Sequence, residues 1–179
     1  MHQDMERCLI SARDIEDKVA GLAKKISADY RGKNLLVVGI LKGAVLFMAD
    51  LVRKMEIPVN IDFMAVSSYG SSTESSGVVR IMKDLDQSME GRHVLIVEDI
   101  IDTGLTLKYL VEYLETRQAA SVEVCTLLDK PDRRKAEVKV KYNGFTVPDE
   151  FLVGFGLDYN EQYRNLPEVY ILKKEVYGG

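Results

Sequence analysis

The two most apolar runs of the chain constrain its fold more than any other feature. Residues 35–41 (LLVVGIL) and 94–97 (VLIV) are uninterrupted, as in strands that are covered on both faces of a sheet. Residues 44–55 and 107–114, which follow these runs, carry apolar side chains at helical spacing. A third strand pattern lies at 121–128. Strands and helices in this order predict an α/β fold with a mainly parallel, twisted sheet flanked by helices.

Weaker patterns predict the remaining elements. Ser11, with Asp14 three residues later, indicates the start of a helix. In residues 58–66 apolar and polar side chains alternate, which predicts a half-exposed strand. Residues 67–77 (SSYGSSTESSG) are polar with two glycines, so a mobile loop is expected there. Further short strands are expected at 78–82, at 138–142 and, one or two of them, within 151–172.

Length, charge and cysteine content exclude several classes of protein. The chain has 179 residues, which is enough for one self-sufficient domain spanning 1–179. Its formal net charge of −4 argues against a nucleic-acid partner. Lys42 interrupts the one stretch apolar enough to suggest a membrane span. Cys8 and Cys125 cannot build a disulfide framework, and the first residues carry no apolar leader, so a cytoplasmic protein without a membrane partner is expected.

The run at 94–97 leads directly into a polar motif that can bind a ligand. Glu98 and Asp99 follow the run, and Asp-Thr-Gly (102–104) then precedes a helical pattern. Ligands of parallel α/β sheets bind beyond the carboxyl ends of the strands, and free amides at a helix start attract phosphate. The two acids suit sugar hydroxyls or a hard cation. The motif therefore predicts a site for a phosphorylated sugar.

Asp-Thr-Gly has two other interpretations. Asp102 or Thr103 can serve merely as a helix N-cap, a common role for both residue types. Asp-Thr-Gly is also the tripeptide of aspartic proteases, but there it occurs in an all-β setting, whereas a helical pattern follows here. The chain contains neither a Walker loop nor a G-x-G-x-x-G motif, so the common nucleotide-binding loops are absent.

The segment VLIVEDIIDTGLT closely resembles the phosphoribosyl-pyrophosphate signature of the type I phosphoribosyltransferase family, and of its hypoxanthine-guanine branch in particular. The segments GILKGAVLF, SSYGSST, LLDKPDRR and VPDEFLVGFGLDYNEQYRNLP resemble further segments of the family in the same order. The resemblance covers nearly the whole chain. It implies the type I phosphoribosyltransferase fold, with a small hood and a mobile lid loop, and an assembly of two or four identical chains.

The resemblance also implies a role for each segment that contacts phosphoribosyl pyrophosphate. Leu41, Lys42 and Gly43 would form the pyrophosphate loop, with a non-proline cis peptide bond before the lysine. Arg164 would bind the same pyrophosphate. The 5′-phosphate would lie in the loop of Asp102, Thr103, Gly104, Leu105 and Thr106.

The carboxylates and the lid have implied roles as well. Glu98 and Asp99 would hold the ribose hydroxyls, and together with Asp158 they would hold Mg²⁺. Ser68 and Tyr69 would belong to the lid that closes over the reacting centre. Read without the family, Asp158 and Arg164 could equally form a surface ion pair, and Lys42 could be a strand-end lysine in solvent.

The purine half of the site is implied by four residues. Asp102 would transfer the proton at purine N7, and Lys130 would donate to the oxygen at position 6. Phe151 would stack on the base, while backbone groups of Phe151 and Leu152 would read its edge. Read alone, Lys130 could be a solvated charge and Phe151 a core residue. Two neighbouring acids, Asp129 and Glu150, leave the choice between hypoxanthine and guanine open.

The resemblance therefore implies a purine-salvage enzyme that joins hypoxanthine, with guanine as a second base, to phosphoribosyl pyrophosphate in the presence of Mg²⁺. Its partners would be these small molecules. Two alternatives stay open: an RNA-binding regulator of nucleotide synthesis that has kept the fold, and a phosphoribosyltransferase specific for xanthine or a pyrimidine. The presence of Lys130, Phe151, Asp158 and Arg164 argues against the regulator, which would not need them.

Overall fold

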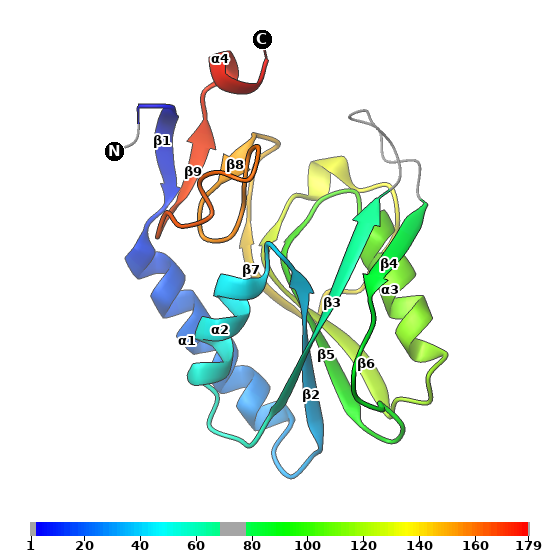
Figure 1. Ribbon diagram of the computed structural model, residues 1–179. Helices are drawn as coiled ribbons and strands as arrows, with labels where there is room; N and C mark the ends of the chain where they lie inside the picture. The colour runs from blue at the N-terminus through cyan, green and yellow to red at the C-terminus, as the bar shows by residue number, and fades with distance from the viewer. Residues whose placement is uncertain (1–2, 69–77, 179) are drawn as a thin grey trace.

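The computed structural model describes residues 3–68 and 78–178, and it is built around one six-stranded sheet (Figure 1). The strands of this sheet are β2 (Leu35–Leu41), β3 (Asn60–Ser68), β4 (Val79–Lys83), β5 (His93–Ile101), β6 (Ser121–Asp129) and β7 (Tyr142–Thr146). Their order is β4-β3-β2-β5-β6-β7, and all neighbours are parallel except β3 and β4. The predicted α/β fold with a mainly parallel sheet is confirmed.

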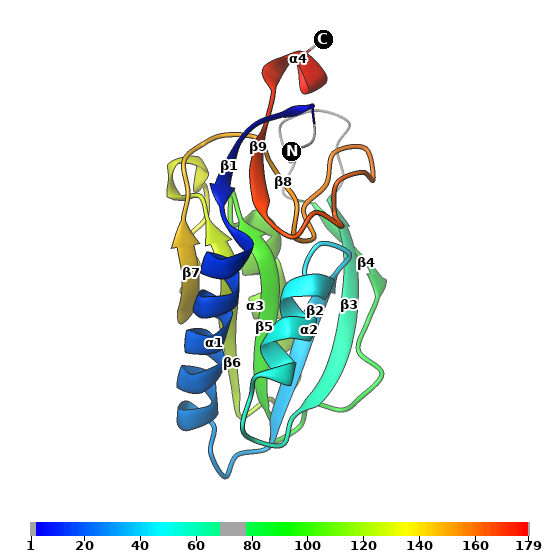
Figure 2. The same cartoon turned by 90° about the vertical axis from the view of Figure 1, so that its left-hand side faces the viewer.

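Helices cover both faces of the sheet, which explains why its central strands are apolar throughout. Helices α1 (Ala12–Asp29) and α2 (Val45–Arg53) lie on one face and α3 (Leu105–Glu115) on the other (Figures 1 and 2). Along β2, Val37 packs into the core cluster under α1 and α2, whereas Leu36 and Val38 pack into the cluster under α3. Successive strand residues point to opposite faces, so each needs an apolar side chain.

A second, smaller sheet forms a hood above the first. Strands β1 (Met5–Ile10), β9 (Val169–Leu172) and β8 (Leu152–Val153) are antiparallel in that order, and helix α4 (Lys174–Tyr177) follows them (Figure 1). Helix α1 connects the hood to the large sheet. It begins as the sequence predicts, because the Ser11 side chain accepts a hydrogen bond from the Asp14 N–H at 3.1 Å.

Two sequence-based predictions are wrong in detail. Residues 138–141 are not a strand; Val138 and Val140 pack against the cluster beneath α3, and pairing with β6 begins at Tyr142. In β3 the strand is confirmed, but Ile61 is 47% exposed and Asp62 is buried. The Asp62 carboxylate accepts hydrogen bonds from backbone N–H groups of the segment after β4 as well as from its own strand, which compensates for its burial.

The predicted lid lies largely outside the described residues. Strand β3 ends at Ser68, and residues 69–77, including Tyr69, are not described, so the prediction of a mobile loop stays a prediction. The basic turn after β6 contains a short 3₁₀ helix, η1 (Pro131–Arg133). Within the described ranges, no helix is both long enough and apolar enough to cross a membrane.

Candidate active site

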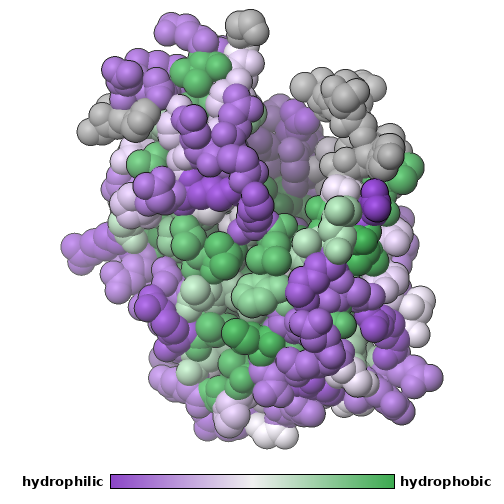
Figure 3. All heavy atoms as spheres, viewed as in Figure 1, coloured by the Kyte–Doolittle hydropathy of each residue, from purple (hydrophilic) through white to green (hydrophobic). Residues whose placement is uncertain are grey.

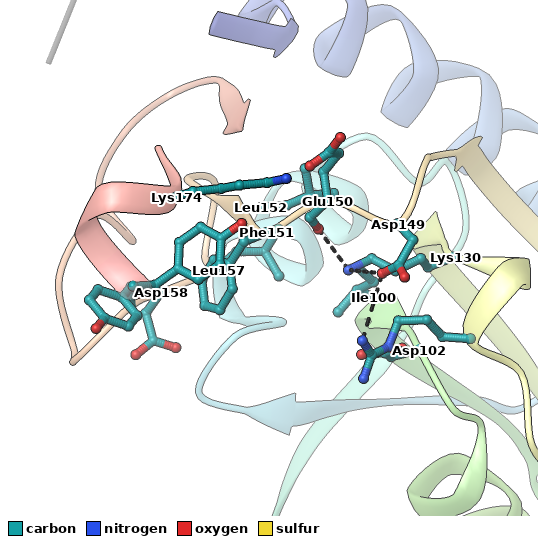
Figure 4. Close-up of a pocket in the computed structure, with 13 residues that line it drawn as sticks. Ile100, Asp102, Lys130, Asp149, Glu150, Phe151, Leu152, Leu157, Asp158 and Lys174 are labelled. Atoms are coloured by element: carbon teal, nitrogen blue, oxygen red, sulfur yellow. Dashed lines mark hydrogen bonds and ion pairs between the residues drawn. The ribbon is translucent and has the colours of Figure 1, made fainter. Parts of the chain in front are cut away.

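The predicted functional residues gather between the carboxyl edge of the large sheet and the hood. Loops from β2, β5 and β6 reach this region, and the segment from 149 to 164 faces them from the hood. A cavity of about 760 Å³ lies between the two parts (Figure 4). A second cavity of about 200 Å³ lies at the end of β5. Asp102 lines both cavities, so it stands where the two halves of a ligand would meet.

The acids of the motif lie inside β5, not after it, because the strand continues to Ile101. Glu98 and Asp99 are half-buried, and their carboxylates are held by local hydrogen bonds: the Asp99 N–H donates to Glu98 Oε1 at 3.3 Å and the Ile100 N–H to Asp99 Oδ1 at 2.7 Å. Burial raises the pKa of both carboxyl groups, and the charge of Asp99 raises the pKa of Glu98 further. A cation bound beside the pair would favour the charged form of both groups.

The loop after β2 is packed directly against this acidic pair. The peptide bond between Leu41 and Lys42 is cis, as the family resemblance implies. Gly43 lies so close to the strand that a β-carbon there would come within 1.9 Å of Asp99 Oδ2. The predicted pyrophosphate loop and the predicted metal-binding carboxylate are thus in contact, and a larger residue at position 43 would displace one of the two.

The loop from Asp102 to Thr106, apart from Leu105, lines the smaller cavity together with Glu98 and Asp99. Gly104 is the N-cap of α3 and has a φ of +81°, a conformation that favours glycine. Thr103 Oγ1 accepts a weak hydrogen bond from the Leu105 N–H at 3.4 Å. The interpretation of Asp102 as a mere N-cap is wrong, because its carboxylate lies beside Arg133 and Gly104 occupies the N-cap position. The amides that begin α3 border the cavity, as a phosphate-binding loop requires.

The larger cavity contains the predicted purine-binding residues. Lys130 is only 8% exposed; its Nζ donates to the Glu150 carbonyl oxygen at 2.8 Å and lies 3.9 Å from Asp149 Oδ1 (Figure 4). Burial lowers the pKa of Lys130. The interpretation of Lys130 as a solvated charge is therefore wrong. Phe151 and Leu152 line the same cavity, and the ring of Phe151 stacks against that of Tyr177 with 4.7 Å between centroids.

Several residues of the cavity wall were not anticipated from the sequence, among them Arg133, Asp149 and Tyr177. Arg133 Nε lies 2.7 Å from Asp102 Oδ1, and Arg133 Nη1 lies 3.7 Å from Asp149 Oδ1. Tyr177 enters the cavity wall from helix α4. The only signal for Arg133 was its place in a basic turn, and no local pattern marked Asp149 or Tyr177.

The predicted pyrophosphate ligands Lys42 and Arg164 are joined through a residue that sequence reasoning also missed. Lys42 Nζ donates to Glu161 Oε2 at 2.7 Å, and Arg164 Nη2 donates to Glu161 Oε1 at 3.2 Å. Arg164 Nη2 also lies 3.0 Å from Asp158 Oδ1, so the ion pair considered from the sequence is present. The pKa of Glu161 is lowered, mainly because Lys42 donates this hydrogen bond.

The acidic residues of the site provide some of the ligands that a magnesium ion needs. Mg²⁺ in phosphate sites commonly takes one or two carboxylates and completes its shell with water and substrate phosphates. Glu98 and Asp99 provide two such groups, and burial raises the pKa of both. Among the described residues, however, no three acidic, histidine or cysteine side chains gather as a ready-made metal site.

A phosphate-sized loop beside two acids, below a small antiparallel hood, defines the class of phosphoribosyl-transferring domains. The chain belongs to that family, since its residues 10–160 match the phosphoribosyl transferase domain. It is 54% identical over 177 residues to the hypoxanthine-guanine phosphoribosyltransferase of Bacillus subtilis (strain 168), a match that covers 99% of this chain and 98% of that protein.

Two further relatives extend the comparison. A crystal structure of a hypoxanthine phosphoribosyltransferase from Staphylococcus aureus superposes with a TM-score of 0.97 at 51% identity, covering 100% of this chain and 97% of the other. The Bifunctional protein TilS/HprT of Listeria monocytogenes serotype 4b (strain F2365) is 52% identical over 99% of this chain, and the chain spans 27% of that protein's length. The architecture is that of a type I phosphoribosyltransferase domain.

Proposed function

We propose that the chain transfers a phosphoribosyl group from phosphoribosyl pyrophosphate to hypoxanthine, with guanine as a second base, as in purine salvage. The products are the nucleoside monophosphate and pyrophosphate. The observation that carries this proposal is the position of Asp102, which lines both the small cavity beside the α3 amides and the large cavity that contains Lys130. A ligand with a phosphate at one end and a polar ring at the other spans these two spaces.

The phosphoribosyl half of the ligand would lie along β5. The amides of Leu105 and Thr106 and the hydroxyl of Thr103 would bind the 5′-phosphate, where the helix dipole also favours an anion. Glu98 and Asp99 would accept hydrogen bonds from the ribose hydroxyls.

Magnesium fits this half of the site. Glu98 and Asp99 would hold the ion together with pyrophosphate oxygens, and Asp158 would approach from the hood side. When bound, the ion would offset the negative charge that develops on the leaving pyrophosphate. The Leu41–Gly43 loop and Arg164 would bind that group directly.

The purine half would lie in the larger cavity. Lys130 has donors but no acceptor, so it favours an oxygen over an amino group at position 6. As the bond from purine nitrogen to C1′ forms and the bond to pyrophosphate breaks, the Asp102 carboxylate would accept the purine proton at N7. Phe151 would stack on the ring. Asp129 is paired with Arg134, so it is not free to contact the base.

The experiment that tests this function is ultraviolet-monitored turnover of hypoxanthine, guanine, xanthine, adenine and uracil with phosphoribosyl pyrophosphate and Mg²⁺. We expect turnover of the 6-oxopurines, and a fall of about 10²–10⁴-fold in kcat for Asp102→Asn. Turnover confined to xanthine or uracil would replace the substrate assignment. If the folded protein converts no base but is retained on heparin at low salt, the RNA-binding regulator becomes the better reading.

We further propose that residues 1–179 form one domain in the cytoplasm, since both cysteines are free thiols and Cys125 is buried. The chain would act as a homodimer or homotetramer. Apolar side chains gather on the face over α2 and the neighbouring strands (Figure 3). Val45 and Leu46, at the start of α2, are each more than a third exposed. Exposed apolar surface of this kind favours an interface between subunits. Light scattering after size-exclusion chromatography measures the assembly.

A further inference from the structure

Glu161 lies between Lys42 and Arg164, the two cations proposed to bind pyrophosphate. Both of its carboxylate oxygens are used: Oε2 accepts from Lys42 Nζ at 2.7 Å and Oε1 from Arg164 Nη2 at 3.2 Å. Lys42 and Arg164 come from opposite sides of the site, one from the loop after β2 and the other from the segment beyond β8. The bridge therefore resembles the contact that a phosphate group makes with two cations.

The backbone around Glu161 has an unusual conformation that places this side chain between the two cations. Asn160, Glu161 and Tyr163 have φ values of +50°, +62° and +77°, in the left-handed region that non-glycine residues rarely adopt. The Glu161 N–H donates to Asp158 Oδ2 at 2.9 Å, and the backbones of Tyr159 and Gln162 pair across the turn. Conformations of this kind persist where the surrounding structure holds them, and they cluster at functional sites.

A purely structural role does not account for the bridge. The side chains of Lys42 and Glu161 are 68% and 64% exposed, and an ion pair so open to solvent contributes little to folding. The same exposure makes the pair easy to separate when a stronger anion arrives. Pyrophosphate carries several negative charges, whereas Glu161 carries one.

We propose that Glu161 is an internal counter-anion that occupies Lys42 and Arg164 in the empty site and thereby lowers the affinity for both pyrophosphate-bearing ligands. The inference rests on the proposed function, which assigns these two cations to the pyrophosphate group. Phosphoribosyl pyrophosphate and free pyrophosphate displace the same carboxylate, so both are weakened by a similar factor. Weaker pyrophosphate binding speeds release of the product, a step that limits turnover in many enzymes. Glu161 is thus a positioning residue, and it does not touch the reacting atoms.

Replacement of Glu161 by glutamine separates this role from a structural one. In Glu161→Gln the side chain keeps its shape and loses its charge. We expect the KM for phosphoribosyl pyrophosphate and the inhibition constant of pyrophosphate to fall together by about 3- to 10-fold, with the KM for hypoxanthine unchanged. The difference from the unmodified protein should shrink as salt rises, because the pair is exposed and screened. A second variant, Glu161→Asn, tolerates the left-handed backbone and should behave alike.

Glu112→Gln is the matched control. Glu112 forms an exposed ion pair with Lys108 on α3, at 3.9 Å, away from the site, and its loss should leave all constants unchanged. Calorimetric binding of pyrophosphate with Mg²⁺ to the same proteins tests the inference without turnover. If the unmodified protein binds pyrophosphate but converts no base, the proposed function fails while the effect of Glu161 is still measured. An unchanged or weaker affinity for pyrophosphate in folded Glu161→Gln would overturn the inference.

Discussion

The contact between Gly43 and Asp99 makes a sharp prediction about the geometry of the site. A β-carbon at position 43 would lie 1.9 Å from Asp99 Oδ2, whereas real contacts of this kind stay beyond 3.0 Å. In Gly43→Ala either the loop or the carboxylate must therefore move by about 1 Å, and a misplacement of this size costs on the order of 100-fold in rate. That factor corresponds to about 2.7 kcal/mol of lost transition-state stabilisation. We expect the loss in kcat/KM for phosphoribosyl pyrophosphate.

The assay is the initial rate of hypoxanthine conversion over a range of phosphoribosyl pyrophosphate concentrations, with urea unfolding monitored in parallel. Gly21→Ala is the control, because a β-carbon at Gly21 in α1 meets nothing within 4 Å. A helical Gly-to-Ala change of this kind should raise stability by about 0.5–1 kcal/mol and leave the rate unchanged. The reasoning fails if folded Gly43→Ala stays within about threefold of the control in kcat/KM.

Three further predictions concern charge, pH and metal. Lys130→Gln should lower kcat/KM for hypoxanthine by about 10- to 100-fold, because a buried charge-assisted hydrogen bond is lost; equal losses with a base lacking the 6-oxo group would contradict this assignment. The pKa of Asp84 is lowered, since hydrogen bonds from Tyr113, the Leu85 N–H and Arg117 outweigh the effect of burial. Its contribution to stability is therefore present above the ordinary carboxyl pKa and lost as pH falls through the folded value. The urea midpoint of Arg117→Gln should lie below that of the unmodified protein at neutral pH, and the two should converge as pH falls through the folded pKa of Asp84. Removal of Mg²⁺ with a chelator should abolish turnover and readdition should restore it; turnover that persists in excess chelator would refute the magnesium assignment.

The fold was predictable where burial alone decides the structure. Residues 35–41 are apolar because helices cover both sides of β2, and the strand has the predicted bounds. The prediction failed at 138–141 because alternation reports which side chains pack inward, and Val138 and Val140 are partly buried against the core without a partner strand. Strand β1 was missed because its pairing with β9 joins residues more than 150 positions apart, and no local pattern records such a contact.

The candidate site divides in the same way. Residues 98–106 share one stretch of chain, so their common position at the end of β5 followed from the sequence pattern. The residues that set the charge around them could not be predicted from that pattern. Arg133 reaches Asp102, and Glu161 joins Lys42 to Arg164, through contacts that only the folded arrangement of separate loops creates. Surface charges of this kind look alike in the sequence whether solvent or a ligand site surrounds them.

The pairing of β1 with β9 has a consequence for synthesis of the protein on the ribosome. All six strands of the large sheet lie before residue 147, so the sheet and its phosphate-binding loop can assemble while the rest of the chain is still being made. The hood cannot, because β1 and β8 both need β9, which begins at Val169. A nascent chain can therefore form the proposed phosphate-binding end of the site before β9 has been made, whereas the hood wall of the proposed purine cavity forms only after β9.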